Sequence, residues 1–166
     1  MDKIDSLNQV AEFHRTFQHP IKDHPGIPSP TRCDLRVSLI AEELEELKQA
    51  IVDRDMVEIS DALCDLQYVL SGAVLEFGLG NKFVELFDEV QRSNMSKSCE
   101  TEGEAQATVD YYQDHKDTPC YYREVDGKFL VFRTGDDKTL KSVNYSPADL
   151  KLILEREAMG TLNSEQ

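Results

Sequence analysis

Apolar residues recur with helical spacing through most of this chain, and two segments carry the pattern most clearly. Residues 30–52 and 56–77 each place apolar side chains three or four positions apart, which gives a helix one apolar stripe. The stripes consist of Ile40, Leu44, Leu47 and Ile51 in the first segment and of Ile59, Leu63, Leu66, Leu70 and Phe77 in the second. A short polar link, residues 52–55, joins the segments and favours an antiparallel helical hairpin whose stripes form a core.

Proline, glycine and small polar residues indicate where the other elements begin and end. Further helices are predicted over residues 4–18, 81–91, 101–115 and 148–158, and a proline-rich loop over residues 19–30. Ser29-Pro30 and Ser146-Pro147 are typical helix starts, and Gly78 is a typical helix end. Asp126-Gly127 predicts a β-hairpin within residues 120–137, with a candidate further strand over 138–143.

Together these elements predict a mainly α protein, an antiparallel helical bundle with a small C-terminal β-hairpin appendage. The working core is expected in residues 1–97. Residues 98–166 are expected to form the appendage, in which a short helix, the hairpin and the final helix pack on that core.

Composition narrows the class of protein. At 166 residues with 40% hydrophobic and 30% charged residues, the chain suits a soluble globular protein. Its net charge of −14 argues against binding nucleic acid polymers or anionic membranes, and an anionic metabolite would need metal ions to screen it. No signal peptide, membrane-spanning run or CxxC pair is recognisable, so a reducing, cytoplasmic setting is expected. Cys64 is expected to be a buried small hydrophobe.

Two acidic clusters lie on the predicted helical hairpin. Residues three or four apart share a helix face, so Glu43 pairs with Glu46 and Glu58 pairs with Asp61. Across an antiparallel hairpin the four carboxylates can converge on one groove, where a divalent cation would explain so much negative charge. An all-oxygen set suits Mg²⁺, with Mn²⁺ as a substitute. The alternative is an ordinary solvated acidic face, and Asp55-x-x-Glu58 also resembles a capping box.

The stretch RSNMSK, residues 92–97, offers groups that suit a phosphorylated substrate. Mg²⁺ held by carboxylates keeps positions open for substrate phosphates, and one use of such a site is cleavage of a phosphoanhydride. Arg92 and Lys97 would then be cations for phosphate, and Asn94 a polar contact. The alternative is that Arg92 and Lys97 are charges at a helix C-terminus, where they complement the helix dipole.

Several stretches together resemble one family. Glu42-Glu43-x-x-Glu46 followed by Glu58-x-x-Asp61 resembles the EExxE and ExxD signature of the MazG-like all-α nucleoside triphosphate pyrophosphohydrolases, which are related to phosphoribosyl-ATP pyrophosphohydrolase. The resemblance extends over nearly all of residues 7–97 and about 140–154, in the blocks VAEFHRTF, LIAEELEEL, DALCDLQYVLSGAVLEFG, FDEVQRSNMSK and LKSVNYSPADL. Residues 98–139 depart from it, because a helix and a hairpin stand where the family pattern leads us to expect a short linker.

The resemblance implies roles for particular residues. The implied Mg²⁺ ligands are Glu43, Glu46, Glu58 and Asp61. Glu42 would support these ligands or help to activate the attacking water. The implied nucleotide contacts are Arg92, Asn94 and Lys97. His14 could line a base pocket together with Phe17, although a satisfied core or surface histidine is the alternative for His14. The resemblance also implies a homodimer or homotetramer with sites near the subunit contacts.

The activity that the resemblance implies is Mg²⁺-dependent hydrolysis of the α–β phosphoanhydride of a nucleoside triphosphate. The products would be the monophosphate and pyrophosphate, and house-cleaning of the nucleotide pool would be its use. One alternative is phosphoribosyl-ATP pyrophosphohydrolase, which would share the metal site and differ in the pocket. Another is a non-catalytic acidic helical module that binds a partner or Ca²⁺. The complete set of motif residues favours the enzyme, since a silent relative should have lost at least one of them.

Overall fold

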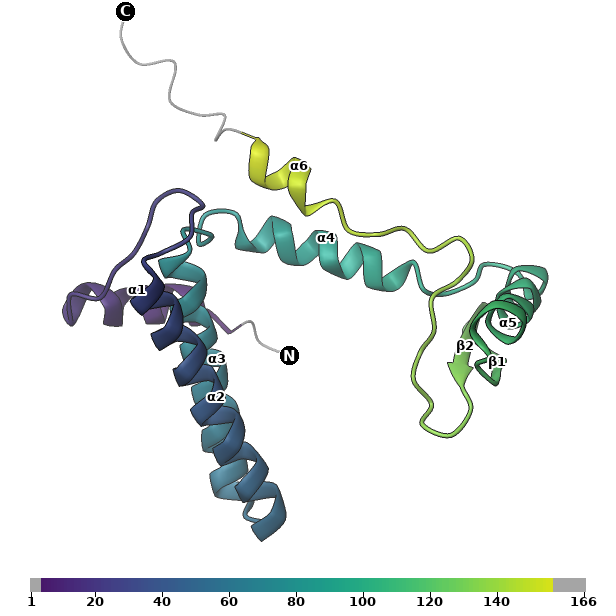
Figure 1. Ribbon diagram of the computed structural model, residues 1–166, viewed down its shortest axis with the longest axis horizontal. Coiled ribbons are helices and arrows are strands. Elements are labelled where there is room, and N and C mark those ends of the chain that lie inside the picture. The colour runs from purple at the N-terminus through teal and green to yellow at the C-terminus, as the bar shows by residue number, and fades with distance from the viewer. Residues whose placement is uncertain (1–3, 157–166) are drawn as a thin grey trace, which may run out of the picture. The chain divides into compact units, whose positions relative to one another are not determined.

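The computed structural model describes residues 4–156, which contain six helices and two strands (Figure 1). It confirms a mainly α protein with a small C-terminal β-hairpin. The chain divides into two compact units between Phe83 and Val84. The helix predicted over residues 81–91 therefore groups with the C-terminal unit, although the sequence placed it in the N-terminal core.

The N-terminal unit is built on the predicted antiparallel hairpin of α2, Pro30–Asp53, and α3, Met56–Glu76 (Figure 1). The turn between them is short because Arg54 adopts a left-handed conformation, with a φ of 56°. The Asp55 side chain then accepts hydrogen bonds from the backbone N–H groups of Val57 at 2.9 Å and Glu58 at 3.2 Å, so it is the N-cap of α3. A third helix, α1, Ser6–Thr16, packs against α3.

The proline-rich loop is fastened to the end of α3. The backbone N–H of Lys22 donates to the carbonyl oxygen of Leu75 at 3.0 Å. Gly78 ends the helix as predicted, with a φ of 70°, and a Cβ at this position would lie 1.9 Å from the His24 carbonyl oxygen. Only glycine fits here, because both the left-handed conformation and the loop backbone exclude a side chain.

The two apolar stripes are less buried than the sequence predicted. The structure buries Val10, Ala11 and Leu75 where α1 meets α3, but it leaves Leu44 56% and Leu63 52% exposed. Cys64 is also exposed rather than buried. The reason is geometric: α1 has 11 residues against 24 in α2, so it covers only part of the hairpin.

The C-terminal unit has its own core beneath a helix and the hairpin. Its main elements are α4, Phe83–Met95, α5, Glu102–Lys116, β1, Cys120–Val125, β2, Lys128–Arg133, and α6, Leu150–Glu155. The core consists of Cys99, Ala105, Val109, Cys120, Val131 and Leu140. The strands are antiparallel and pair Val125 with Lys128, so Asp126-Gly127 is the two-residue turn that the sequence predicted.

Three predicted boundaries in this unit are wrong. The helix α4 continues to Met95 because no glycine or proline interrupts residues 84–102. Residues 138–143 do not form a further strand; Thr139 makes only an isolated bridge with Phe132 of β2, and beyond Leu140 Ser142 donates a hydrogen bond to Glu104 of α5. The final helix begins at Leu150, capped by Asp149, because Arg92 already binds Ser146 and Pro147. The last residues of that predicted helix, 157–158, lie outside the described residues.

Candidate functional site

Acidic side chains of α2 and α3 gather around Glu43. We call this set, which consists of Glu42, Glu43, Glu46, Asp61 and Asp65, the acidic groove. Glu43 is half-buried, and its Oε2 atom is buried with no hydrogen-bond donor among the described residues. The pKa of Glu43 is raised, first by burial and then by the negative charges of Glu46, Asp65, Glu42 and Asp61. Carboxylates from both helices therefore lie around one oxygen that has no partner.

The structure gathers most of the predicted ligands and adds one acidic residue. Glu46 of α2 and Asp61 of α3 both act on Glu43, and so does Asp65, which the family motif does not require. Glu58 is exposed near the hairpin turn and is not among the charges that act on Glu43. Within residues 4–156, no group of three or more Asp, Glu, His or Cys side chains is already placed to hold a metal ion.

No cation of the described chain neutralises this groove. Lys48, the nearest lysine in sequence, pairs with Glu45 at 2.9 Å, away from the predicted ligands. None of the ion pairs found in residues 4–156 involves the four predicted ligands. An all-oxygen donor set with one buried, unpartnered carboxylate oxygen fits Mg²⁺ or Mn²⁺, which prefer carboxylate ligands.

A cavity of about 220 Å³ lies in the same unit, among α1, α2, α3 and the loop after α1. Its aromatic lining comes from Phe13, His19 and Tyr68, and the Phe13 ring stacks on His19 with 5.7 Å between centroids and meets Tyr68 edge-on at 5.6 Å. Phe17, which the sequence suggested for a base pocket, follows the end of α1 at Thr16, is 61% exposed and is not among the residues that line this cavity.

A buried charge network forms one wall of the cavity. Glu76 is only 1% exposed and accepts hydrogen bonds from the guanidinium groups of Arg32 and Arg36. Burial by itself would raise the pKa of Glu76, but the two arginines outweigh it and hold the pKa below its usual value. Gly72 makes the room for this network, since a Cβ there would lie 2.7 Å from Arg36 Nη1.

His14 belongs to the same network. Its side chain is 2% exposed, and Nδ1 lies 2.9 Å from the Pro20 carbonyl oxygen. This contact requires Nδ1 to carry the proton, so Nε2 is left as an acceptor facing Arg36 Nη2 at 3.4 Å. Burial lowers the pKa of His14, and the charge of Arg36 lowers it further. The histidine is therefore a neutral, satisfied residue in the wall of the cavity.

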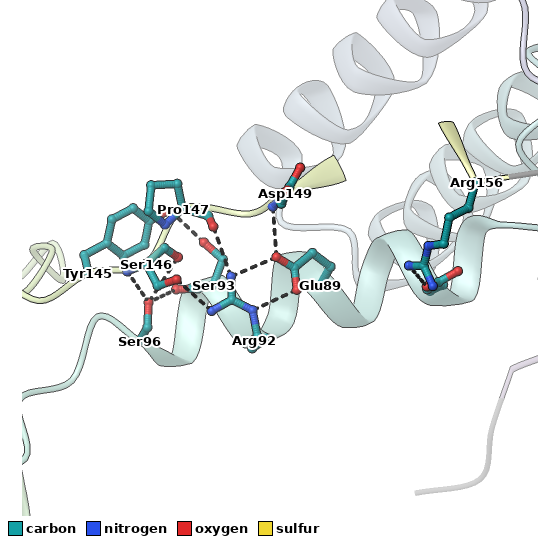
Figure 2. A network of polar contacts seen from close by, with 10 residues as sticks. Glu89, Arg92, Ser93, Ser96, Tyr145, Ser146, Pro147, Asp149 and Arg156 are labelled. Atoms are coloured by element: carbon teal, nitrogen blue, oxygen red, sulfur yellow. Dashed lines mark hydrogen bonds and ion pairs between the residues drawn. The ribbon is translucent and has the colours of Figure 1, made fainter. Parts of the chain in front are cut away.

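In the C-terminal unit, the predicted phosphate contacts lie at the end of α4, and Arg92 is already occupied (Figure 2). Its guanidinium donates to both carboxylate oxygens of Glu89, at 2.7 and 2.8 Å, and to the Ser146 hydroxyl and the Pro147 carbonyl oxygen, each at 3.0 Å. Arg92 lowers the pKa of Glu89 to about 2. Asn94 lies in the last turn of α4, and Lys97 forms no ion pair with another described residue.

Sequence reasoning missed the buried charge network and gave Asp65 too little weight. Two signals were present. Arg32 and Arg36 are four residues apart on one helix face, and Glu76 is the one acid in the apolar run VLSGAVLEFG. A carboxylate in such a run has to be paired, because an isolated buried charge is very costly.

Comparison with known proteins identifies the family of this chain. The family model described as "Phosphoribosyl-ATP pyrophosphohydrolase" matches residues 10–94, about half of the chain. The chain belongs to this family, which lies in the MazG-like superfamily. Family membership supports nucleotide pyrophosphohydrolase activity in general terms.

One relative is a viral protein. "Uncharacterized protein L479" of Acanthamoeba polyphaga mimivirus is 37% identical over 82 residues, which are 47% of this chain and 33% of the relative. The chain thus matches about a third of the relative's length. No helix within residues 4–156 is both long enough and apolar enough to cross a membrane.

Proposed function

We propose that this protein hydrolyses the α–β phosphoanhydride of a nucleoside triphosphate in a Mg²⁺-dependent reaction that releases the monophosphate and pyrophosphate. One observation carries the proposal. The buried Oε2 atom of Glu43 has no partner among the described residues, and carboxylates of two helices surround it without a cation. An external cation would stabilise the folded protein here, because a buried carboxylate without a partner raises the free energy of the fold.

The cavity beside the acidic groove supports a nucleotide as the substrate. Leu39 lines the cavity and lies four residues before Glu43 on α2, while Val69 lines it and lies four residues after Asp65 on α3. Four residues of helix span about 6 Å, so the cavity and the carboxylates are neighbours along one groove. A planar base stacked on the Phe13 ring would leave its phosphates near the metal ligands.

Each candidate residue has a role in this proposal. Glu43, Glu46 and Asp61, with Asp65 beside them, would hold the metal, and Glu58 would join by rotation of its exposed side chain. When bound, Mg²⁺ polarises the phosphoryl group and lowers the pKa of water. Glu42 would accept the proton of the attacking water. Asn94 and Lys97 would contact the phosphates, and His14 would hold the base pocket in shape. Arg92, which the sequence also assigned to the phosphates, would hold the end of α4 in place through its bonds to Glu89, Ser146 and Pro147.

The exposed stripes of the hairpin support an oligomer. Leu44, Ile51, Leu63 and Leu70 are each between 45% and 56% exposed although they continue the core stripes. Apolar residues that repeat along two helix faces typically mark a contact with another chain. We propose a homodimer or homotetramer in the cytoplasm, and sedimentation or light scattering of the purified protein should report at least a dimer.

The family description gives a second candidate substrate, phosphoribosyl-ATP, which would use the same metal site. A panel of ribo- and deoxyribonucleoside triphosphates and phosphoribosyl-ATP, with pyrophosphate and phosphate measured separately, tests both candidates. Turnover should require Mg²⁺ or Mn²⁺ and stop with a chelator. Glu45→Gln is a matched control, because Glu45 is exposed on the same helix and pairs with Lys48.

Other outcomes would reject the proposal. Release of phosphate with a nucleoside diphosphate would mean that a different bond is cleaved. Binding of Ca²⁺ without turnover of any compound in the panel would favour the non-catalytic acidic module.

A further inference from the structure

The segment after Leu140 is fixed to α4 along about two helical turns, from Glu89 to Ser96 (Figure 2). The Ser146 N–H donates to the Ser96 hydroxyl at 3.0 Å, and the Asp149 N–H donates to Glu89 at 2.9 Å. Arg92 adds its two bonds to Ser146 and Pro147. We call residues 141–149 the C-terminal strap, and these bonds hold its second half in one register on α4.

The first half of the strap is held from α5. The Lys141 N–H donates to the Tyr112 hydroxyl at 3.2 Å, and the Val143 N–H donates to the Thr108 hydroxyl at 3.1 Å. Thr108 is fully buried, so this end is anchored in the core of the unit. The strap therefore holds Lys141 and Tyr145 in fixed positions beside the end of α4.

Two lysines, Lys141 and Lys97, act on Tyr145. Its hydroxyl is 2.8 Å from that of Ser93, which is 3% exposed on α4, and the ammonium of Lys141 lies 4.2 Å from the centre of its ring. Lys97 acts on the same ring from the end of α4, and both lysines lower the pKa of Tyr145 after its hydrogen bond with Ser93 does so.

Two positive charges therefore act on Tyr145 without a counter-ion of their own. The chain has 32 acidic residues against 18 Lys and Arg, yet neither Lys97 nor Lys141 forms an ion pair with another residue of the described chain. Like charges that act on one side chain also repel each other, and an anion bound near them would offset that repulsion. Packing of the strap on α4 does not by itself explain why both Lys97 and Lys141 are present.

We infer that Lys97, Lys141 and the Tyr145 hydroxyl form a binding site for a di- or triphosphate group, in which Lys141 rather than Arg92 is the partner of Lys97. Arg92 is a positioning residue, since its guanidinium is spent on Glu89 and the strap. Two ammonium groups suit a phosphate chain, which they bind as point charges. The inference rests on the proposed function only for the source of that phosphate group.

Binding of inorganic anions tests the site without turnover. Titration calorimetry of the full chain with tripolyphosphate, pyrophosphate and a nucleoside monophosphate, all with a chelator present, separates a phosphate-chain site from a nucleoside site. The wild type should bind the two inorganic anions. Lys97→Gln and Lys141→Gln should each weaken that binding about tenfold, the factor that corresponds to ~1.4 kcal/mol. Tyr145→Phe should weaken it by a smaller factor, and Lys141→Arg should retain it.

Two controls separate binding from folding. Lys138→Gln removes a lysine of the same connection that lies beside Asp136, and it should bind the anions as the wild type does. Hydrogen exchange of the amides of residues 142–149 should accelerate in Arg92→Gln and stay unchanged in Lys141→Gln. If Lys141→Gln accelerates this exchange as much as Arg92→Gln does, its loss of binding is structural and the inference is wrong.

The outcomes also distinguish this inference from the proposed function. Nucleotide hydrolysis with an unchanged KM in Lys141→Gln, together with unchanged anion binding, overturns the site and leaves the activity standing. Lys141-dependent binding of pyrophosphate in a protein that hydrolyses no nucleotide supports the site and rejects the proposed activity.

Discussion

Two carboxylates of the α2–α3 hairpin, Glu76 and Glu43, differ in how they are neutralised. Glu76 is buried and accepts hydrogen bonds from two arginines, so its pKa is lowered. Glu43 has a buried oxygen with no donor and only acidic neighbours, so its pKa is raised. The two residues belong to the same helix pair, and the same fold produces both states.

The difference teaches that the acidic groove is not a fault of packing. Arginines on α2 reach across to neutralise a carboxylate on α3 where neutrality is a structural need. Where α2 faces the acidic groove, it carries Glu42, Glu43 and Glu46 instead of arginines. The simplest physical account is that the counter-ion of the groove comes from outside the chain, which is the basis of the proposed metal site.

The largest expected effect comes from removing one carboxylate of the groove. Glu46→Gln or Asp61→Asn should lower activity by more than about 100-fold, since loss of even an outer-shell partner of a metal costs up to that factor. Stability should hold or rise, because each change relieves repulsion among like charges. Steady-state kinetics and thermal unfolding of the same preparations measure both effects.

Metal addition supplies the control for this prediction. Mg²⁺ should raise the unfolding temperature of the wild type, since a ligand that binds only the native state stabilises it. The rise should be smaller in both variants and unchanged in Glu45→Gln. Near-wild-type turnover in both variants, with the same metal dependence, would show that the groove is not the site.

The second prediction removes one of the two arginines that neutralise Glu76. Arg36→Met should destabilise the protein by about 3–5 kcal/mol, because it leaves Glu76 buried with one partner lost. The double variant Arg36→Met, Glu76→Leu should recover much of this loss, since the buried carboxylate is then gone and the Arg32 side chain, which is 29% exposed, can turn to solvent. Urea unfolding measures the free energies. Equal losses in the single and the double variant would mean that packing, not charge, holds this end of the hairpin.

The third prediction concerns the space that the network needs. Gly72→Ala should destabilise by about 1–3 kcal/mol, the usual cost of overpacking, because the new Cβ would lie 2.7 Å from Arg36 Nη1 and 3.1 Å from His14 Nε2. Gly103→Ala is the matched control in α5, where the nearest atom is 4.0 Å away. The control should be neutral or slightly stabilising. Equal losses of stability in Gly72→Ala and Gly103→Ala would mean that a Cβ at residue 72 does not crowd Arg36 and His14.

Local signals in the sequence predicted the elements that depend on local chemistry. The Asp55 cap, the Gly78 helix end and the Asp126-Gly127 turn each need one residue type at one position, and all three predictions are confirmed. The start of α6 could not be predicted in this way, because it depends on bonds between residues more than 50 positions apart, such as Arg92 with Ser146.

The candidate site was predictable only in part for a similar reason. Helical spacing identified Glu43, Glu46 and Asp61 as neighbours on the facing flanks of the hairpin. The same spacing could not decide between Glu58 and Asp65, since both lie on one flank of α3 and only the helix packing sets which one comes near Glu43. Local patterns show that Glu76 needs a partner, but they could not show that its partners are two arginines 40 and 44 residues earlier.

The smallest expected effect is a pH dependence that comes from the network around Glu76. Burial and the charge of Arg36 lower the pKa of His14, so the unfolded chain binds a proton at this residue more readily than the native state. The stabilisation from neutral His14 is therefore complete above its ordinary pKa of about 6.5 and is lost as the pH falls below it. The pKa of Glu76 is lowered too, but its contribution is lost only as the pH falls below the ordinary value of 4.5 for this group. Urea unfolding between pH 7.5 and 5.5 should thus show a fall in stability that is shallower in His14→Gln than in the wild type. The control His115→Gln, an exposed change on α5, should keep the wild-type slope.

A slope that is the same in all three proteins would mean that His14 accepts a proton in the native state as easily as in the unfolded chain. The neutral tautomer assigned from its contact with Pro20 would then be wrong.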